Sequence, residues 1–233
     1  MECRKKSVRS HLDLRERRYF RRKVLHWFHS HRRRFPWRTR ANPFHVLVAE
    51  VLLQQTDAPK VAAIYDQFIR AFPTPAALSV ADERRIGKFI SKIGLNYRGA
   101  RLISTAAAIN SRFDGQVPND RAGLLSLMGV GPYVANAVLA AAFRRRAAVL
   151  DTNVIRVLGR FFGLRSRCPR PHTDPVLWAA AQELLPRDGR MARTWNWAVL
   201  DFAAAVCRRR SPLCPECPCR GLCRFASTRR CGL

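Results

Sequence analysis

Residues 127–133 read Leu-Met-Gly-Val-Gly-Pro-Tyr, and these seven residues determine how the middle of the chain is built. Gly129 and Gly131 flank one apolar residue and allow positive φ angles, while Pro132 suits the first turn of a helix. Helical spacing predicts a short helix near residues 120–127 and an apolar helix from Pro132 to about Phe143. The pattern therefore predicts two short helices joined by a tight turn.

The same turn has a possible binding role. Backbone N–H groups of Gly129, Val130 and Gly131 lie at the start of the next helix, where the helix dipole favours an anion such as a DNA phosphate. A glycine pair between two helices is most often only a tight connection, and that interpretation stays open beside the first.

On both sides of the turn the apolar spacing is helical. It predicts further helices near residues 14–31, 42–55, 61–72, 82–92, 98–112, 152–163, 175–185 and 191–206. No alternating strand pattern of useful length occurs, so we expect an all-α chain without internal repeats or long linkers.

Four cysteines near the end of the sequence form the second chemical signal. Cys207, Cys214, Cys217 and Cys223 follow the spacing C-x6-C-x2-C-x5-C, with three prolines between them that break helix. This crowded spacing favours a [4Fe-4S] cluster over zinc, and disulfides are the third alternative. Cys219 lies inside the loop as a possible fifth ligand. The remaining cysteines, which we expect to be free thiols, are Cys3, Cys168 and Cys231.

The charge of the chain predicts a polyanionic partner. The 43 Lys and Arg residues against 16 Asp and Glu give a net charge of +27, which fits nucleic acid or an anionic membrane surface. No apolar run is long enough for a membrane span, and we expect a cytoplasmic, nucleoid-associated protein. We interpret residues 1–12 as a solvated tip and Leu14 to His31 as a docked helix with a basic outer face.

Four segments in one order carry a family resemblance: AEVLLQQT at 49–56, LMGVGPY at 127–133, VLDTNVIRV at 149–157 and the four-cysteine loop. The chain resembles the helix-hairpin-helix DNA glycosylases of the endonuclease III and MutY superfamily, and within it the mismatch thymine/uracil glycosylases and the catalytic half of MutY. The resemblance strengthens the [4Fe-4S] interpretation.

The resemblance implies two helical lobes that bind DNA in a groove and flip the target nucleotide out of the duplex. Residues 40–145 would form a six-helix barrel with the hairpin. Residues 146–233 would form the cluster lobe, with the basic segment 1–39 packed against it. The partner would be double-stranded DNA with a mispaired base, bound by a monomer.

It also implies roles for single residues. Asp151 would be the catalytic aspartate, a role compatible with capping the following helix. Tyr133 stands where bifunctional members place a lysine, so base release without strand cleavage is expected. Glu50, in an apolar helix, would protonate or hydrogen-bond the leaving base, unless it is only a buried acid paired with an arginine. Gln54 and Gln55 would fill the gap left by the flipped base.

Two departures bear on the substrate. Met128 replaces the proline that is usual in this hairpin, and only ten residues follow Cys223, which leaves no room for the domain by which MutY enzymes recognise 8-oxoguanine. Thymine or uracil opposite guanine is therefore the favoured substrate, and adenine is the alternative. A non-catalytic iron-sulfur DNA-binding protein and a zinc-dependent transcription factor are the other classes.

Overall fold

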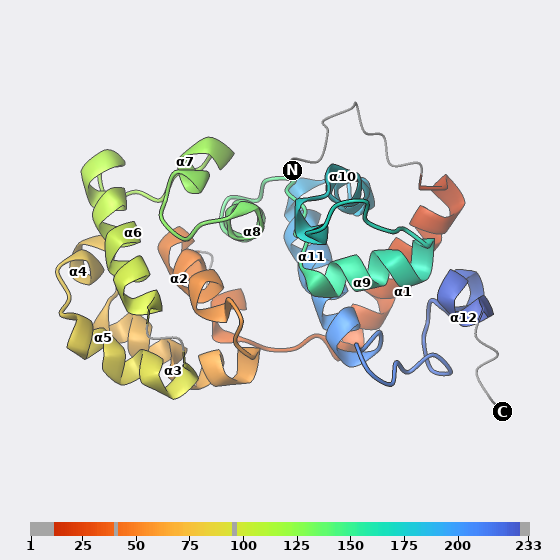
Figure 1. Ribbon diagram of the computed structural model, residues 1–233, viewed down its shortest axis with the longest axis horizontal. Coiled ribbons are helices and arrows are strands. Elements are labelled where there is room, and N and C mark those ends of the chain that lie inside the picture. The colour runs from red at the N-terminus through yellow and green to blue at the C-terminus, as the bar shows by residue number, and fades with distance from the viewer. Residues whose placement is uncertain (1–11, 40–41, 95–96, 229–233) are drawn as a thin grey trace. The chain divides into compact units, whose positions relative to one another are not determined.

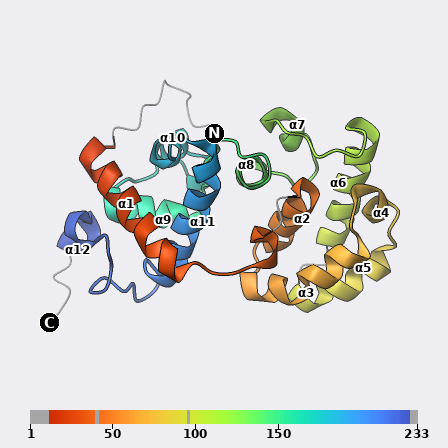
Figure 2. The same ribbon diagram turned by 180° about the vertical axis from the view of Figure 1, so that it is seen from behind.

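A computed structural model describes residues 12–39, 42–94 and 97–228 of the protein. The described residues form helices, turns and irregular segments without a strand, which confirms the all-α prediction (Figures 1 and 2). The chain divides into two compact units. Unit 1 comprises Met1–Arg33 and Arg146–Leu233, and unit 2 comprises Arg34–Arg145.

Unit 2 is built around one helix that is buried on nearly every side. Helix α2 has buried residues from Phe44 to Leu52, because its sequence is apolar in every turn. It packs against α8, α3 and α6, while α4 packs against α6. The elements of this unit are η1 (Pro36–Arg38), α2 (Pro43–Leu53), α3 (Ala58–Ala71), α4 (Pro75–Ser79), α5 (Glu83–Ile90), η2 (Ser91–Ile93), α6 (Arg98–Arg112), α7 (Arg121–Leu125) and α8 (Pro132–Ala141).

Local signals set where these helices begin. The side chain of Asn42 accepts a hydrogen bond from the backbone N–H of His45 at 3.1 Å, and Pro43 occupies the first turn of α2. Asp120 caps α7 in the same way, through the N–H of Gly123 at 2.8 Å. These caps begin the two helices that carry or precede the predicted site residues of unit 2.

Unit 1 has an aromatic core around Phe20 of α1. The ring centroid of Phe20 lies 4.6 Å from that of Phe161, 5.4 Å from Phe162, 5.9 Å from Trp195 and 6.0 Å from Phe202. Burial of five such rings is a large part of what holds this unit together. Its elements are α1 (Leu14–His31), α9 (Thr152–Phe162), η3 (Pro171–Thr173), α10 (Pro175–Leu184), α11 (Gly189–Ala205), η4 (Arg220–Leu222) and α12 (Arg224–Thr228).

The structure bears on the predictions for the first helix, for the cysteines outside the loop and for membrane spans. Helix α1 has the predicted bounds, Leu14–His31, whereas the solvated tip predicted for residues 1–12 lies, up to residue 11, outside the described residues. Cys168 is disulfide-bonded, so the expectation of a free thiol there is wrong; Cys3 and Cys231 lie outside the described residues. Within the described part of the chain, no helix is both long and apolar enough to cross a membrane.

Candidate active site and cluster loop

Asp151 is fixed at the start of α9. It is the N-cap residue, and its Oδ1 accepts a hydrogen bond from the N–H of Val154 at 2.8 Å. Its Oδ2 accepts one from the Asn153 side-chain amide at 2.6 Å. The carboxylate is half-buried, so its orientation is set by two donors while lone pairs remain for a third group.

The neighbours of Asp151 tie α9 to the end of α11. Arg156 Nη2 donates to the Asn153 side-chain oxygen at 3.0 Å and to the carbonyl of Ala203 at 2.9 Å. Its Nε donates to the carbonyl of Cys207 at 2.8 Å. Helix α9 therefore fixes both the Asp151 carboxylate and the first residue of the cysteine loop.

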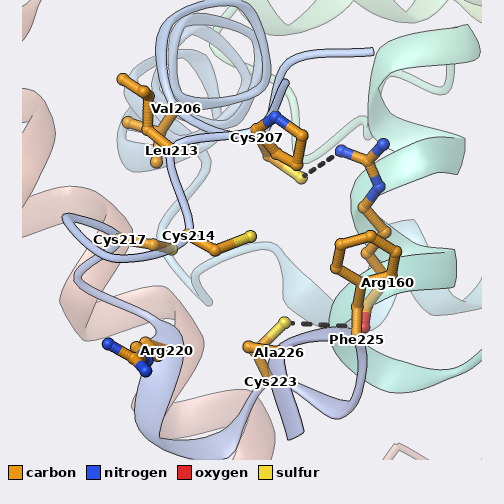
Figure 3. Close-up of a pocket in the computed structure, with 11 residues that line it drawn as sticks. Arg160, Val206, Cys207, Leu213, Cys214, Cys217, Arg220, Cys223, Phe225 and Ala226 are labelled. Carbon is orange, nitrogen blue, oxygen red and sulfur yellow. Dashed lines mark hydrogen bonds between the residues drawn. The ribbon is translucent and has the colours of Figure 1, made fainter. Parts of the chain in front are cut away.

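The four predicted cluster ligands lie around one pocket. Cys207, Cys214, Cys217 and Cys223 all line it, and Figure 3 shows the sulfur atoms of Cys207, Cys214 and Cys223 directed toward the same space. The space between the atoms, counting its part open to solvent, is about 310 Å³. Cys219 is buried and does not line this pocket.

The donors of this pocket are cysteine thiols. None of the five loop cysteines is in a disulfide, which excludes the disulfide alternative for them. Four thiols are the donor set of a tetrahedral zinc site and of an iron-sulfur cluster alike. Within the described residues, no three His, Cys, Asp or Glu side chains form a group that could hold a metal ion as they stand.

Arg160 of α9 lies against this loop. Its Nη1 approaches Cys207 Sγ at 3.6 Å and donates to the carbonyl of Arg208 at 2.6 Å, while Nη2 donates to the carbonyl of Arg209 at 3.0 Å. Burial raises the pKa of the Cys207 thiol, and the hydrogen bond and charge of Arg160 oppose that rise. The arginine therefore favours the thiolate that a metal would bind.

Two neighbouring thiols of the loop differ in character. The Cys219 thiol hydrogen-bonds Cys217 and lowers the pKa of Cys217 to about 7, against the opposing effect of burial. The same hydrogen bond raises the pKa of Cys219, and burial adds to that rise. The pKa of Cys217 is therefore the lower of the two, and Cys217 is also the one of the pair that lines the pocket.

Two side chains from other parts of unit 2 donate hydrogen bonds to backbone carbonyls of the hairpin turn. Gly129 has a φ of 75°, the left-handed conformation that glycine adopts without strain. Thr105 Oγ1 donates to the carbonyl of Met128 at 2.8 Å, and Gln54 Nε2 donates to the carbonyl of Gly129 at 3.0 Å. These two hydrogen bonds hold the turn that lacks the usual proline.

The hairpin residues expose different groups. Val130 is 5% exposed, so its side chain belongs to the core, and its backbone N–H donates to the carbonyl of Leu127 at 3.2 Å. Met128, in contrast, is 58% exposed. The hairpin can therefore offer backbone N–H groups at the start of α8, which begins at Pro132 with Gly131 as its N-cap.

The remaining predicted site residues of unit 2 lie on α8, on α2 and in the turn after α2. Tyr133 is half-buried in the first turn of α8. Glu50 is 9% exposed within α2. Gln54 is bonded to the hairpin, whereas Gln55 is exposed and has a φ of 55°, which is unusual for a residue other than glycine. Of the two glutamines, only Gln55 therefore has an exposed side chain.

The sequence analysis did not single out several arginines that shape these regions. Arg98 is fully buried and donates to the carbonyl of Leu52 at 2.9 Å and to Thr56 Oγ1 at 2.6 Å, which fixes the turn that carries the two glutamines. No pattern in the sequence marks this role. Arg208, Arg209 and Arg210 are exposed between the first two cysteines, and that run was visible in the sequence.

Comparison with known proteins gives a family match and close relatives. Residues 48–183, more than half of the chain, match the family described as HhH-GPD superfamily base excision DNA repair protein. A thymine-DNA glycosylase of Aeropyrum pernix is 39% identical over 205 residues, which cover 87% of this chain and 92% of the relative. An adenine DNA glycosylase of Mycobacterium tuberculosis is 35% identical over 84% of this chain, but the match spans only 64% of that relative.

Two solved structures are also similar. The structure of a thermostable thymine-DNA glycosylase has a TM-score of 0.86 at 34% identity, and the match covers 92% of this chain and 98% of the other. A trapped endonuclease III–DNA covalent intermediate has a TM-score of 0.79 at 27% identity, covering 94% and 99%. By its family match and its relatives, this chain belongs to the HhH-GPD superfamily of base excision DNA repair proteins.

Proposed function

We propose that the protein is a monofunctional DNA N-glycosylase that removes thymine or uracil mispaired with guanine. The observation that carries this proposal is the Asp151 carboxylate, fixed by two hydrogen bonds at the N-terminus of α9. The thymine-DNA glycosylase of A. pernix, which the match covers over 92% of its length, supports the choice of base.

Asp151 would act on the sugar. As the glycosidic bond breaks, positive charge develops on the deoxyribose, and a carboxylate held in place stabilises that charge without having to reorient. The same oxygens can orient the attacking water. Because Val154 and Asn153 occupy one direction on each oxygen, the remaining lone pairs are those that would face the substrate.

Tyr133 would limit the reaction to base release. Strand cleavage by a glycosylase needs an amine that attacks the sugar carbon and forms a Schiff base, and a phenol has no such amine. The expected product is an abasic site in an uncut strand.

Glu50 and the two glutamines would act on the bases. A carboxyl group in an apolar helix suits protonation of the leaving base or a hydrogen bond to it. Gln55 is the better candidate for the gap left by the flipped nucleotide, because it is exposed while the Gln54 amide is bonded to the hairpin.

DNA would be held mainly through its phosphates. The hairpin N–H groups of Gly129 and Gly131 and the exposed Arg208 to Arg210 suit this role, whereas the N–H of Val130 is donated to Leu127 within the turn. We propose duplex DNA bound by a monomer near the nucleoid, with the hairpin lobe in residues 40–145 and the cluster lobe in residues 146–233 together with residues 1–39.

We also propose that Cys207, Cys214, Cys217 and Cys223 hold a [4Fe-4S] cluster. When bound, the cluster would join four points of the loop into one rigid unit and so fix the backbone that presents Arg208 to Arg210. Arg160 would support the loop from α9 through the carbonyls of Arg208 and Arg209.

A second candidate substrate is adenine opposite guanine. The adenine DNA glycosylase of M. tuberculosis is 35% identical to this chain, and a glutamic acid such as Glu50 can protonate a purine ring. The thymine-DNA glycosylase of A. pernix has the higher identity, 39%, which favours the pyrimidine mismatch.

Single-turnover base release tests the proposal. The duplexes share one sequence and contain G:T, G:U, G:A, adenine opposite 8-oxoguanine, or an oxidised pyrimidine. We expect the fastest release from G:T and G:U, strands that stay uncut until alkali or heat is applied, and no covalent adduct after borohydride. Faster release of adenine would assign the second candidate instead. Duplex binding without release of any base would indicate a non-catalytic DNA-binding protein.

A further inference from the structure

Helix α1 uses its basic side chains in two different ways. Arg17 pairs with Glu183 of α10 at 3.3 Å, and Arg21 Nη1 donates to the carbonyl of Leu185 at 3.3 Å. Arg15, Arg18 and Arg22 are exposed, and no hydrogen bond or ion pair joins them to another described residue. At positions i, i+3 and i+7 they share one face of the helix.

These three arginines line an open cleft of about 730 Å³ in unit 1. Its other wall is Gly221 and Leu222 of η4, at the end of the cysteine loop. We call this feature the α1 cleft. Figure 2 shows α1, in red and orange, running along the outside of unit 1.

A hydrogen bond and a close contact join the two walls of the cleft. The Tyr19 hydroxyl, which lies between the arginines on α1, donates to the carbonyl of Pro218 at 3.4 Å. A Cβ atom on Gly221 would lie 3.1 Å from Tyr19 Oη, so the Tyr19 side chain would have to shift by a few tenths of an ångström to admit a larger residue. The cleft is therefore shaped by specific contacts between α1 and the cysteine loop.

The charge of the cleft is positive. Asp13 is the one acidic residue among its described lining, and the Asp13 carboxylate accepts a hydrogen bond from the N–H of Glu16 at 2.9 Å. The nearby Glu16 carboxylate is paired with Arg224 at 3.3 Å. Three arginines thus face one carboxylate that already caps a helix.

We propose that the α1 cleft binds the phosphate backbone of duplex DNA. The inference rests on the proposed function in taking DNA as the ligand. From Arg15 to Arg22 the helix rises by about 10.5 Å, which corresponds to the rise of roughly three nucleotides along the duplex axis. A guanidinium group matches phosphate with two parallel hydrogen bonds, so a row of three follows a backbone well.

The test is a triple substitution, Arg15→Gln with Arg18→Gln and Arg22→Gln. Substitution is preferable to deletion of α1, because Phe20 and Val24 of this helix are fully buried. The matched control is Arg165→Gln with Arg167→Gln and Arg170→Gln, which removes the same charge from exposed residues of unit 1 that do not line the cleft.

Binding to an undamaged duplex is measured as a function of salt. Each phosphate contact contributes about 0.9 to the slope of log K against log salt, so the cleft variant should lower that slope by about 2–3. The control should lower it by less than about 1, since only general charge is lost. Equal changes in the two variants would overturn the proposal. Thermal unfolding checks that both variants stay folded.

Two further measurements distinguish failure of the cleft proposal from failure of the proposed function. At limiting enzyme, single-turnover base release should be slower in the cleft variant than in the control variant, because less of the duplex is bound. Equal rates in the two variants would contradict the proposal. If the native protein releases no base, the proposed function is wrong, but the salt dependence of duplex binding still tests whether the cleft binds DNA.

Vesicles of phosphatidylserine and phosphatidylcholine test the other candidate polyanion, an anionic membrane surface. Vesicle binding lost in the cleft variant, with an unchanged DNA slope, would assign the cleft to a membrane surface.

Discussion

The carboxylate of Asp151 has two roles that a single substitution can separate. It caps α9, and we propose that it stabilises charge on the sugar. Asparagine is as good an N-cap as aspartate, because its side-chain oxygen accepts the same hydrogen bond, but it carries no charge. A substitution can thus remove the chemistry and keep the helix.

We therefore expect Asp151→Asn to lower single-turnover base release by about 10²–10³-fold or more, with duplex affinity and the free energy of unfolding nearly unchanged. Asp151→Ala, which also removes the cap, should in addition cost about 1 kcal/mol of stability. Full activity of the asparagine variant would show that Asp151 is only a cap.

The N-cap role of Asp151 was predictable, because a carboxylate before a helix is a local pattern, whereas its catalytic role is what the family resemblance implies. The partners of that helix were not predictable. Arg156 donates to the carbonyls of Ala203 and Cys207, some fifty residues away, and such contacts exist only once α9 and α11 pack. Arg98, fully buried beside the turn after α2, is unpredictable for the same reason.

Among the elements, the hairpin shows best how backbone conformation restricts sequence. Gly129 has a φ of 75°, and an added Cβ would lie 3.2 Å from Arg101 Cδ. Gly131 has a φ of −89°, and nothing lies within 4 Å of an added Cβ. The two glycines of one motif thus have different constraints.

Accordingly, Gly129→Ala should lower the free energy of unfolding by about 1–2 kcal/mol, the cost of a left-handed residue with a side chain. Gly131→Ala should change it by less than about 0.5 kcal/mol, because a small loss at the N-cap is offset by a less flexible unfolded chain. Denaturant unfolding of the pair measures both. Equal losses in the free energy of unfolding for the two variants would contradict the role given to the positive φ of Gly129.

The cysteine loop allows a similar comparison between neighbours. Cys217 lines the pocket and Cys219 does not. We expect about four irons per chain in protein purified without oxygen, as one cubane requires. Cys217→Ala should lose the iron and the visible absorbance, and Cys219→Ala should keep both. Stoichiometric zinc in the native protein, or loss of iron in both variants, would refute this ligand set.

Long helices were predictable, whereas of the described five-residue helices only α7, beside the glycine turn, was predicted. The apolar spacing predicts α1 with its observed bounds, because eighteen residues repeat the helical period several times. Helices α4 and α12 have five residues each and were missed, since so short a segment shows hardly more than one period. Thr74, whose side chain caps α4 through the N–H of Ala77 at 3.2 Å, was the available local signal.

For the whole molecule, the two units should respond differently to the loss of iron. The cysteine loop contacts α9 and α1 of unit 1 through Arg160 and Tyr19. A ligand that binds only the folded state stabilises the region it binds. After chelation of iron, hydrogen exchange should therefore become faster in residues 207–223 and α9, while the amides of α2 in unit 2 keep their protection. Equal loss of protection in both units would contradict this.

The division of unit 1 into two segments has a consequence for synthesis. Helix α1 leaves the ribosome first, yet its packing partners α9 and α11 follow only after the roughly 110 residues of unit 2. At about 5–20 residues per second, the apolar side chains Phe20, Val24 and Phe28 wait roughly 5–20 s for their core. Charged residues beside an apolar stretch oppose aggregation, so Arg15, Arg18 and Arg22 would keep the nascent helix from aggregating during that interval.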